Sequence, residues 1–330
     1  MLNHGSIQMK LIMGTTITDN ALQVGQILQL NYRIITPLKS GVFGQTYIAE
    51  DIERTHNNVV LIKRYDANRD QEQLFRSSHR LYTNEIANLK TLGSHPSIPK
   101  FLDAFEDKTG LYVVQEFIDG TLLSDLIPLK VSDRGQWDED EVIHLLLELT
   151  RVLEFVHSNG LIHSDLKPDN IIRRKSDRNF TIIDFANAQM MTDSVEADAL
   201  LIKSNKDLKS KITVTPAGYI SAEQLVGIPH FVSDLYSIGI IGIQTLTGID
   251  PTDVPIGPKN HFLHWPDLLK RHNLKNEFDI DLLNILKTMV SYYPEDRIPS
   301  AQALIDSLKV VERKKRIRSW CFMNGQVMGP

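Results

Sequence analysis

The stretch of residues 163–170, together with the later Asp184, constrains the fold of this chain more than any other feature of its sequence. The intervening residues 171–183 have the pattern of two short strands around a polar turn, which predicts a β-hairpin. Such a hairpin folds Asp184 back beside Asn170, and a carboxylate with an amide oxygen suits Mg²⁺. Asp165, on the same loop as Asn170, can then accept a proton from a hydroxyl group. The arrangement suits phosphoryl transfer.

The first part of the chain alternates apolar and polar residues, which predicts a small antiparallel sheet. Five strands are expected, at residues 32–38, around 47–48, and at 59–65, 101–105 and 111–117. Leucines recur with Glu85 at steps of three and four along residues 71–92, so one amphipathic helix should accompany the sheet. Residues 1–29 contain few hydrophobic anchors and are expected to form a flexible N-terminal segment.

The rest of the chain is mainly helical. Asp138 should cap a long helix that Gly160 ends. Further helices are expected at residues 234–246, 282–290 and 301–310. We therefore predict an α+β fold with a first lobe over residues 30–116, a hinge over 116–120, a helical second lobe over 121–310 and a basic tail over 311–330. The basic tail suits a solvated helix end, or a docking patch for a partner or a membrane.

These segments, in this order, resemble the eukaryotic-like, Hanks-type serine/threonine protein kinases. The family pattern H-R-D-L-x-x-x-x-N and D-F-G has the counterparts H-S-D-L-K-P-D-N at residues 163–170 and D-F-A at 184–186. Looser counterparts lie at residues 38–47, 60–63, 115–120 and 215–224. The resemblance spans residues 32–308 and is greatest to bacterial members. It implies a bilobal protein kinase fold, with a five-stranded first lobe and a mostly helical second lobe.

The resemblance implies a nucleotide site for ATP made of eight residues: Lys39, Gly41, Gly44, Leu61, Lys63, Glu85, Glu116 and Ile118. In that site Lys63 holds the α- and β-phosphates and Glu85 orients Lys63. The backbone from Glu116 to Ile118 contacts the adenine edge. Taken alone, the glycines also suit an ordinary hairpin turn, and Glu85 also suits a surface position.

The resemblance also assigns the chemistry. Asp165, Lys167 and Asn170 are the implied catalytic residues, and Asn170 and Asp184 are the implied Mg²⁺ ligands. Lys167 indicates a serine/threonine kinase rather than a tyrosine kinase, so the expected substrates are proteins with Ser or Thr hydroxyls.

Three further residues have implied structural roles. Glu223 should pair with Arg297, and Asp234 should hold the backbone of the catalytic loop.

Departures from the family pattern leave two alternatives. Ser164 replaces an arginine that receives a loop phosphate in many members, so regulation by loop phosphorylation loses its main cation. We therefore expect that replacing Thr213 and Thr215 together with alanine does not abolish activity through loss of a bound phosphate, and alanine variants of Thr192, Ser194 and Thr213 test this expectation. Ala186 and Lys39 each replace a glycine of the family pattern, and Lys39 is expected to contact either nucleotide phosphate or only solvent. The alternatives to an active protein kinase are a pseudokinase that serves as a nucleotide-binding scaffold, and a small-molecule phosphotransferase of the aminoglycoside-kinase type.

Composition bears on partners and location. The net charge of −5 implies no attraction to nucleic acid. The single cysteine, Cys321, permits no intramolecular disulfide, which suits a reducing compartment. No signal peptide or transmembrane segment is evident, so we expect a cytoplasmic protein. The sequence does not indicate an oligomeric state.

Overall fold

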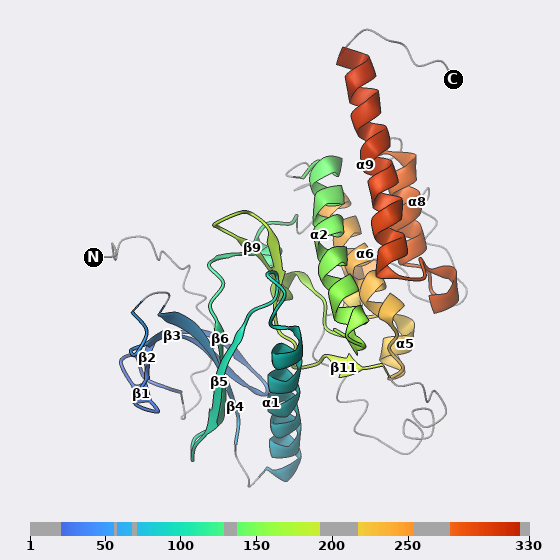
Figure 1. Ribbon diagram of the computed structural model, residues 1–330. Coiled ribbons are helices and arrows are strands. Elements are labelled where there is room, and N and C mark those ends of the chain that lie inside the picture. The colour runs from blue at the N-terminus through green and yellow to red at the C-terminus, as the bar shows by residue number, and fades with distance from the viewer. Residues whose placement is uncertain are drawn as a thin grey trace. The chain divides into compact units, whose positions relative to one another are not determined.

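The computed structural model describes residues 21–55, 58–67, 71–128, 137–191, 217–253 and 278–323. These residues belong to two compact units, of which the first comprises Met1–Tyr82 with Phe101–Phe117 and the second Thr83–Lys100 with Ile118–Pro330 (Figure 1). The residues considered for regulation by loop phosphorylation lie outside the described residues: Thr192, Ser194, Thr213 and Thr215. Within the described part of the chain, every helix is too short or too polar to span a bilayer.

The first unit contains a six-stranded sheet in the order β1-β2-β3-β4-β6-β5, with every neighbouring pair antiparallel. Its strands are β1 (Ile27–Leu28), β2 (Tyr32–Gly41), β3 (Gly44–Asp51), β4 (Val59–Tyr65), β5 (Phe101–Glu106) and β6 (Leu111–Glu116). The five predicted strands are all present. Helix α1 (Glu72–Leu92) confirms the predicted helix, and the division between the units falls inside it.

The sixth strand, β1, corrects the expectation for the end of the N-terminal segment. Residues 21–29 are not a free lead-in, because Leu22 and Leu28 are buried in the core below the sheet. The Leu22 N–H also donates to the Tyr47 hydroxyl at 3.1 Å. A strand of two residues is too short to show an alternating pattern, so it cannot be predicted from local sequence.

The two faces of this sheet have different side chains. Tyr47, Ile62 and Val114 are directly opposite one another across β3, β4 and β6 and belong to the buried core. Because side chains alternate between faces along a strand, the neighbouring residues Leu61 and Gln115 point to the other face. The alternation therefore separates the face packed on this core from a second face, which carries Leu61, Lys63 and Gln115.

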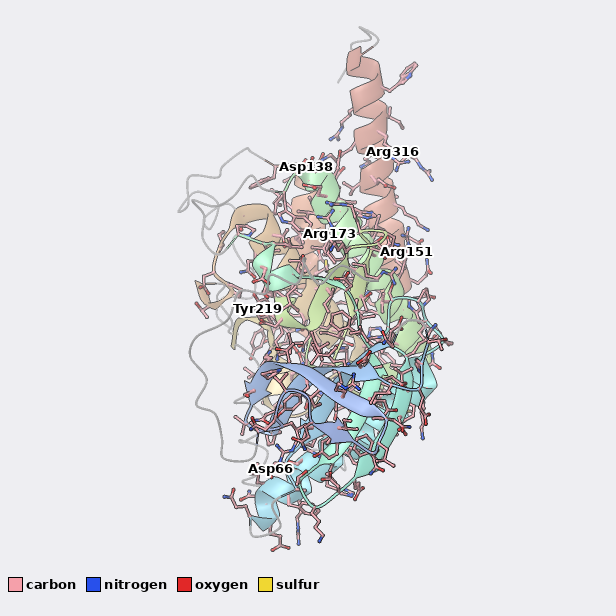
Figure 2. All side chains as sticks on the ribbon, turned by 90° about the vertical axis from the view of Figure 1, so that its left-hand side faces the viewer. Asp66, Asp138, Arg151, Arg173, Tyr219 and Arg316 are labelled. Atoms are coloured by element: carbon pink, nitrogen blue, oxygen red, sulfur yellow. The ribbon has the colours of Figure 1, made fainter. Side chains whose placement is uncertain are left out.

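In its described residues the second unit contains four longer helices after α1: α2 (Glu139–Ser158), α6 (Phe231–Thr247), α8 (Ile280–Met289) and α9 (Ala301–Met323). Helix α2 packs against α6 and α9, and α8 packs against α6 and α9 (Figure 1). Asp138, labelled in Figure 2, forms the predicted cap of α2 as a reciprocal capping box with Glu141. The helix ends at Asn159, and Gly160 follows with a φ of +74°. Both predicted ends of α2 are confirmed.

The buried helix α6 needs small residues where α8 crosses it. A Cβ on Gly239 would lie 2.8 Å from the Met289 Cβ, so only glycine allows this approach. The predicted helix at residues 234–246 corresponds to α6, and that at 282–290 to α8.

Short elements complete the second unit. Strands β7 (Gly120–Leu122), β9 (Ile171–Arg174) and β10 (Phe180–Ile182) form one antiparallel sheet, and β8 (Leu161–Ile162) pairs with β11 (Gln189–Met190). Helix α5 (Ala222–Leu225) precedes α6. Single 3₁₀ turns are η1 (Leu123–Asp125), η3 (Pro168–Asn170), η4 (Ala217–Tyr219), η5 (Pro251–Asp253) and η7 (Pro294–Asp296).

The last helix is longer than predicted, because α9 continues past residue 310 to Met323. The basic residues of the expected tail are therefore helical. Lys315 pairs with Glu139 at 2.6 Å and with Asp140 at 2.8 Å, both at the start of α2. Lys314 pairs with Asp281 at the start of α8 at 2.8 Å. These distant acidic partners explain the extension, which local sequence does not reveal.

Candidate active site

The loop that carries Asp165 is held together by its own side chains. Lys167 Nζ donates to both carboxylate oxygens of Asp165, at 2.9 and 3.0 Å. Asn170 Nδ2 donates to the main-chain oxygen of Asp165 at 2.8 Å and to its Oδ2 at 3.2 Å. All three residues are buried. Because charge-assisted donors in a buried loop fix a carboxylate in one orientation, Asp165 is in position before a ligand binds.

The predicted hairpin is confirmed and brings Asp184 back to this loop. Strands β9 and β10 pair in antiparallel register. Beyond the last strand pair, the Ile183 N–H donates to the main-chain oxygen of Asn170 at 2.9 Å. Asp184 follows directly and has a φ of +70°. The backbone of Asn170 is thus hydrogen-bonded to the residue before Asp184, as the loop and hairpin pattern required.

The side chains of Asn170 and Asp184 fit a divalent metal. The amide nitrogen of Asn170 is committed to Asp165, so its amide oxygen is turned away from that carboxylate and can face a cation. Within the described residues no group of three or more His, Cys, Asp or Glu side chains could hold a metal ion. A site with one carboxylate and one amide suits Mg²⁺ that takes its other oxygens from phosphate and water. The binding of a metal by these residues remains a prediction.

Asp234 on α6 anchors the backbone before Asp165, as predicted. Its Oδ2 accepts from the His163 N–H at 2.8 Å, and its Oδ1 accepts from the Ser164 N–H at 2.9 Å. The His157 Nε2 lies 2.9 Å from Oδ2. Burial lowers the pKa of His163, whose ring packs edge-on against Phe185 with 4.7 Å between the ring centroids. A neutral His163 therefore acts as a packing residue beneath the catalytic loop.

The predicted pair of Glu223 and Arg297 is confirmed as a bidentate buried ion pair. Nη1 of Arg297 lies 2.6 Å from Oε1 of Glu223, and Nη2 lies 3.0 Å from Oε2. The hydroxyls of Ser221 and Ser233 also donate to Oε1. Burial by itself raises the pKa of Glu223, but the hydrogen bond and charge of Arg297 outweigh burial and lower that pKa. The pair joins α5 to the turn before α9.

Two amides that the sequence did not single out also contact this region. Asn88 on α1 donates through Nδ2 to the main-chain oxygen of Phe185 at 2.8 Å. Asn187 Nδ2 lies 3.5 Å from Asp165 Oδ2. Ala186, between Phe185 and Asn187 in the chain, is buried and its φ is not positive. The methyl group that replaces glycine therefore adds no left-handed backbone strain. In the sequence, the position of Asn88 on the predicted helix, three residues after Glu85, was the only indication of its role.

In the first unit, the second face of the sheet gathers the lysines assigned to phosphate binding. The register pairs Thr46 with Lys39 on β2 and with Lys63 on β4. Because directly opposite residues of antiparallel strands share a face, both lysines lie on one face of the sheet. Lys39 is exposed and Lys63 is half-buried. Two ammonium groups beside a glycine turn suit a polyphosphate.

The same face fits a nucleobase near Leu61. Gln115 is directly opposite Leu61 and is 1% exposed, and among the described residues its Oε1 accepts no hydrogen bond. A buried acceptor without a donor is unfavourable, so this oxygen suits a ligand with an N–H group, such as adenine. Sequence reasoning missed Gln115, because one glutamine at the end of a strand gives no signal by itself.

The two glycines of the β2–β3 turn have different roles. A Cβ on Gly44 would lie 1.9 Å from the main-chain oxygen of Arg64, whereas a Cβ on Gly41 would meet no heavy atom closer than 3.9 Å. Gly44 is therefore required by the close approach of β4. Among the described residues nothing crowds a Cβ at Gly41, so a larger side chain would fit there in the absence of a ligand.

The other residues that the resemblance assigns to nucleotide binding are Glu85, Glu116 and Ile118. Glu85, on α1, belongs to the second unit and is fully buried, so the alternative of a surface glutamate is wrong. Glu116 ends β6 in the first unit, and Ile118 begins the next part of the second unit. Both are half-buried.

Comparison with known proteins gives consistent matches over most of the chain. The family model for the protein kinase domain matches residues 32–317. Serine/threonine-protein kinase PknA of Nostoc sp. is 32% identical over 286 residues, which are 86% of this chain and 48% of that protein. Serine/threonine-protein kinase B of Synechocystis sp. is 30% identical over 291 residues, covering 87% and 48%. The chain thus spans about half the length of the curated relatives it matches.

A solved structure titled "PpkA-294 apo form" covers 88% of this chain and 99% of its own, with a TM-score of 0.62 and 20% sequence identity. This similarity confirms the predicted fold class.

Proposed function

This chain belongs to the protein kinase domain family, and on that premise we propose that it is a serine/threonine protein kinase that transfers the γ-phosphoryl group of ATP to hydroxyl groups of protein substrates. The observation that carries the proposal is the buried arrangement of Asp165, Lys167 and Asn170. Three residues that family members use for the reaction are present and bonded to one another. A scaffold that had lost catalysis has no need to keep this loop in order.

In the proposed reaction, the Asp165 carboxylate orients the substrate hydroxyl and accepts its proton. Asn170 keeps that carboxylate in place through its amide nitrogen. Lys167, bonded to Asp165, supplies a positive charge beside the phosphoryl group during transfer. Mg²⁺ held by Asn170 and Asp184 would neutralise phosphate charge.

We propose that the nucleotide lies against the second face of the first sheet, which carries Leu61, Lys63 and Gln115. Lys39 and Lys63 contact its phosphates, and Gln115 with the backbone from Glu116 to Ile118 contacts its adenine. Burial of a charged group is unfavourable unless it is paired, and Glu85 is fully buried. This supports the assignment of Glu85 as the group that orients Lys63 when ATP is bound.

Lys167 supports a preference for serine and threonine, and the names of the bacterial relatives agree with that preference. We further propose that residues 30–310 form the catalytic domain and that residues 116–120 form its hinge.

The decisive experiment measures phosphate transfer from labelled ATP to a generic basic protein, with Mg²⁺ or Mn²⁺, by the purified chain. We expect incorporation into serine and threonine, and a loss of at least ~100-fold in Asp165→Asn, which keeps the size of the side chain. Asp306→Asn is the matched control, because Asp306 is exposed on α9. No incorporation with either metal would favour the nucleotide-binding scaffold, and phosphorylation of small alcohols alone would favour the small-molecule phosphotransferase.

A second measurement tests the site itself. ATP affinity should fall when Mg²⁺ is removed and when Lys63 is changed to Met. Affinity that is indifferent to both changes would contradict the proposed site.

A further inference from the structure

Ser164, the residue directly before Asp165, has an unfavourable backbone conformation. Its φ is +66°, in the left-handed region that residues with a Cβ rarely adopt. Such a conformation persists only where surrounding contacts determine it. Because Asp165 follows immediately, the direction of its carboxylate depends on whatever holds Ser164 in this conformation.

Hydrogen bonds from three separate elements hold Ser164. Its N–H donates to Asp234 Oδ1 on α6 at 2.9 Å. Its main-chain oxygen accepts from Gln224 Nε2 on α5 at 3.0 Å, and its hydroxyl accepts from Gln189 Nε2 on β11 at 3.3 Å. Both backbone groups and the side chain of Ser164 are therefore engaged. All of the groups that contact its oxygens are neutral.

Gln224 is itself oriented by the start of α5. Its Oε1 accepts from the Ser221 N–H at 3.2 Å, which completes the capping box of the helix. The amide oxygen therefore faces the cap and the amide nitrogen faces Ser164. The neighbouring Glu223 is fixed by Arg297, so the donor is on a firmly anchored segment.

We propose that Gln224 is a positioning residue for Asp165, acting by a neutral hydrogen bond that holds Ser164 in its left-handed conformation. In the resembled family pattern an arginine at position 164 receives a loop phosphate. Here glutamine donors occupy the oxygens of a serine, so neutral hydrogen bonds stand at the position of that charged contact. The inference rests on the proposed kinase function for its kinetic consequence, but its structural consequence is independent of activity.

Gln224→Glu isolates this hydrogen bond. Glutamate at the third helical position keeps the acceptor of the capping box, yet it has no donor for the Ser164 oxygen and places an anion beside it. We expect kcat to fall at least ~10-fold while KM for ATP stays within ~2-fold, because the lost contact acts on Asp165 and not on nucleotide. The matched control is Gln302→Glu, which makes the same charge change on the exposed side of α9 and should leave both constants unchanged.

Amide hydrogen exchange supplies a readout that does not require activity. In Gln224→Glu the amides of residues 163–166 should exchange at least ~10-fold faster, and those of α2 should not change. If this variant fails to fold, Gln224→Met removes the donor without adding charge and is measured in its place.

A second variant tests the conformational basis. Glycine adopts a φ of +66° readily, so in a Ser164→Gly background the loss caused by Gln224→Glu should shrink to ~3-fold or less. Unchanged exchange at residues 163–166, a change in KM with kcat intact, or an equal loss in the glycine background would overturn the proposal. If the wild-type chain transfers no phosphate, the proposed function fails by itself, and the exchange rates alone decide for or against Gln224.

Discussion

Removal of the Arg297 guanidinium is the sharpest test of how the second unit is held together. Arg297→Met keeps the length and apolar stem of the side chain but deletes every donor. Two of these donors contact Glu223, and Nε donates to the main-chain oxygen of Ser291 at 2.8 Å. Others reach the main-chain oxygens of Val232 and Tyr292. The variant would therefore leave a buried carboxylate and several carbonyl groups without their partners.

The expected loss of stability follows from the burial of the pair. The Arg297 side chain is 0% exposed and that of Glu223 is 9% exposed, so water replaces little of what is lost. Breaking a buried ion pair by removing one partner costs about 3–5 kcal/mol. That is a large share of the roughly 5–15 kcal/mol by which proteins are stable, and in a chain of this size it lowers the melting temperature by about 4–7 °C.

The pH dependence provides an independent check. The pKa of Glu223 is lowered from its usual value of 4.5 in the folded wild type, although burial alone would raise it. Its contribution to wild-type stability is thus present above pH 4.5 and is lost as the pH falls through the lowered pKa. In Arg297→Met only burial and the two serine hydroxyls remain, so protonation relieves the unpaired charge. The difference in stability between wild type and variant should therefore shrink between pH 7 and pH 4.

The assay is thermal and urea unfolding of the two proteins at several pH values, with Arg316→Met as the matched control. The Arg316 side chain, labelled on α9 in Figure 2, is 77% exposed and pairs only with Glu312 on its own helix in the described structure. Its loss should cost no more than about 0.5 kcal/mol. A loss below about 1 kcal/mol in Arg297→Met, or a deficit that does not vary with pH, would refute this account of the pair.

The two glycines of the β2–β3 turn should respond differently to alanine: Gly44→Ala should lower the melting temperature by several degrees because its Cβ meets the β4 backbone, whereas Gly41→Ala should melt like wild type and raise KM for ATP. Lys315→Met should cost about 1 kcal/mol at neutral pH, because the contacts of Lys315 with Asp140 and Glu139 raise its pKa above 10.5 despite partial burial. Unfolding followed against pH should show this cost disappear as the pH rises through that raised pKa, and a cost that persists in strong alkali would contradict the ion-pair explanation.

Much of the candidate site could be predicted because it depends on short segments. Asp165, Lys167 and Asn170 lie within one loop, and their mutual hydrogen bonds need only the local turn η3. The return of Asp184 needs only one hairpin. The cap of α2 likewise depends on Asp138 and a glutamate three residues later.

Other features were missed because their partners are far away along the chain. Strand β1 is recognisable only from the core that buries Leu22 and Leu28, and the length of α9 only from the acidic residues that Lys314 and Lys315 reach. Gln115 became a candidate only when the register set it opposite Leu61.

The sequence by itself determined the order of strands and helices, the catalytic loop and the kind of chemistry, since alternation, caps and turns act between residues close along the chain. Only the tertiary structure decided which distant polar groups meet. Gln224 lies 60 residues from the oxygen of Ser164 that it contacts, and Arg297 lies 74 residues from Glu223. A buried polar group must find a partner once water is excluded, but its own sequence neighbourhood does not say which partner folding will bring to it.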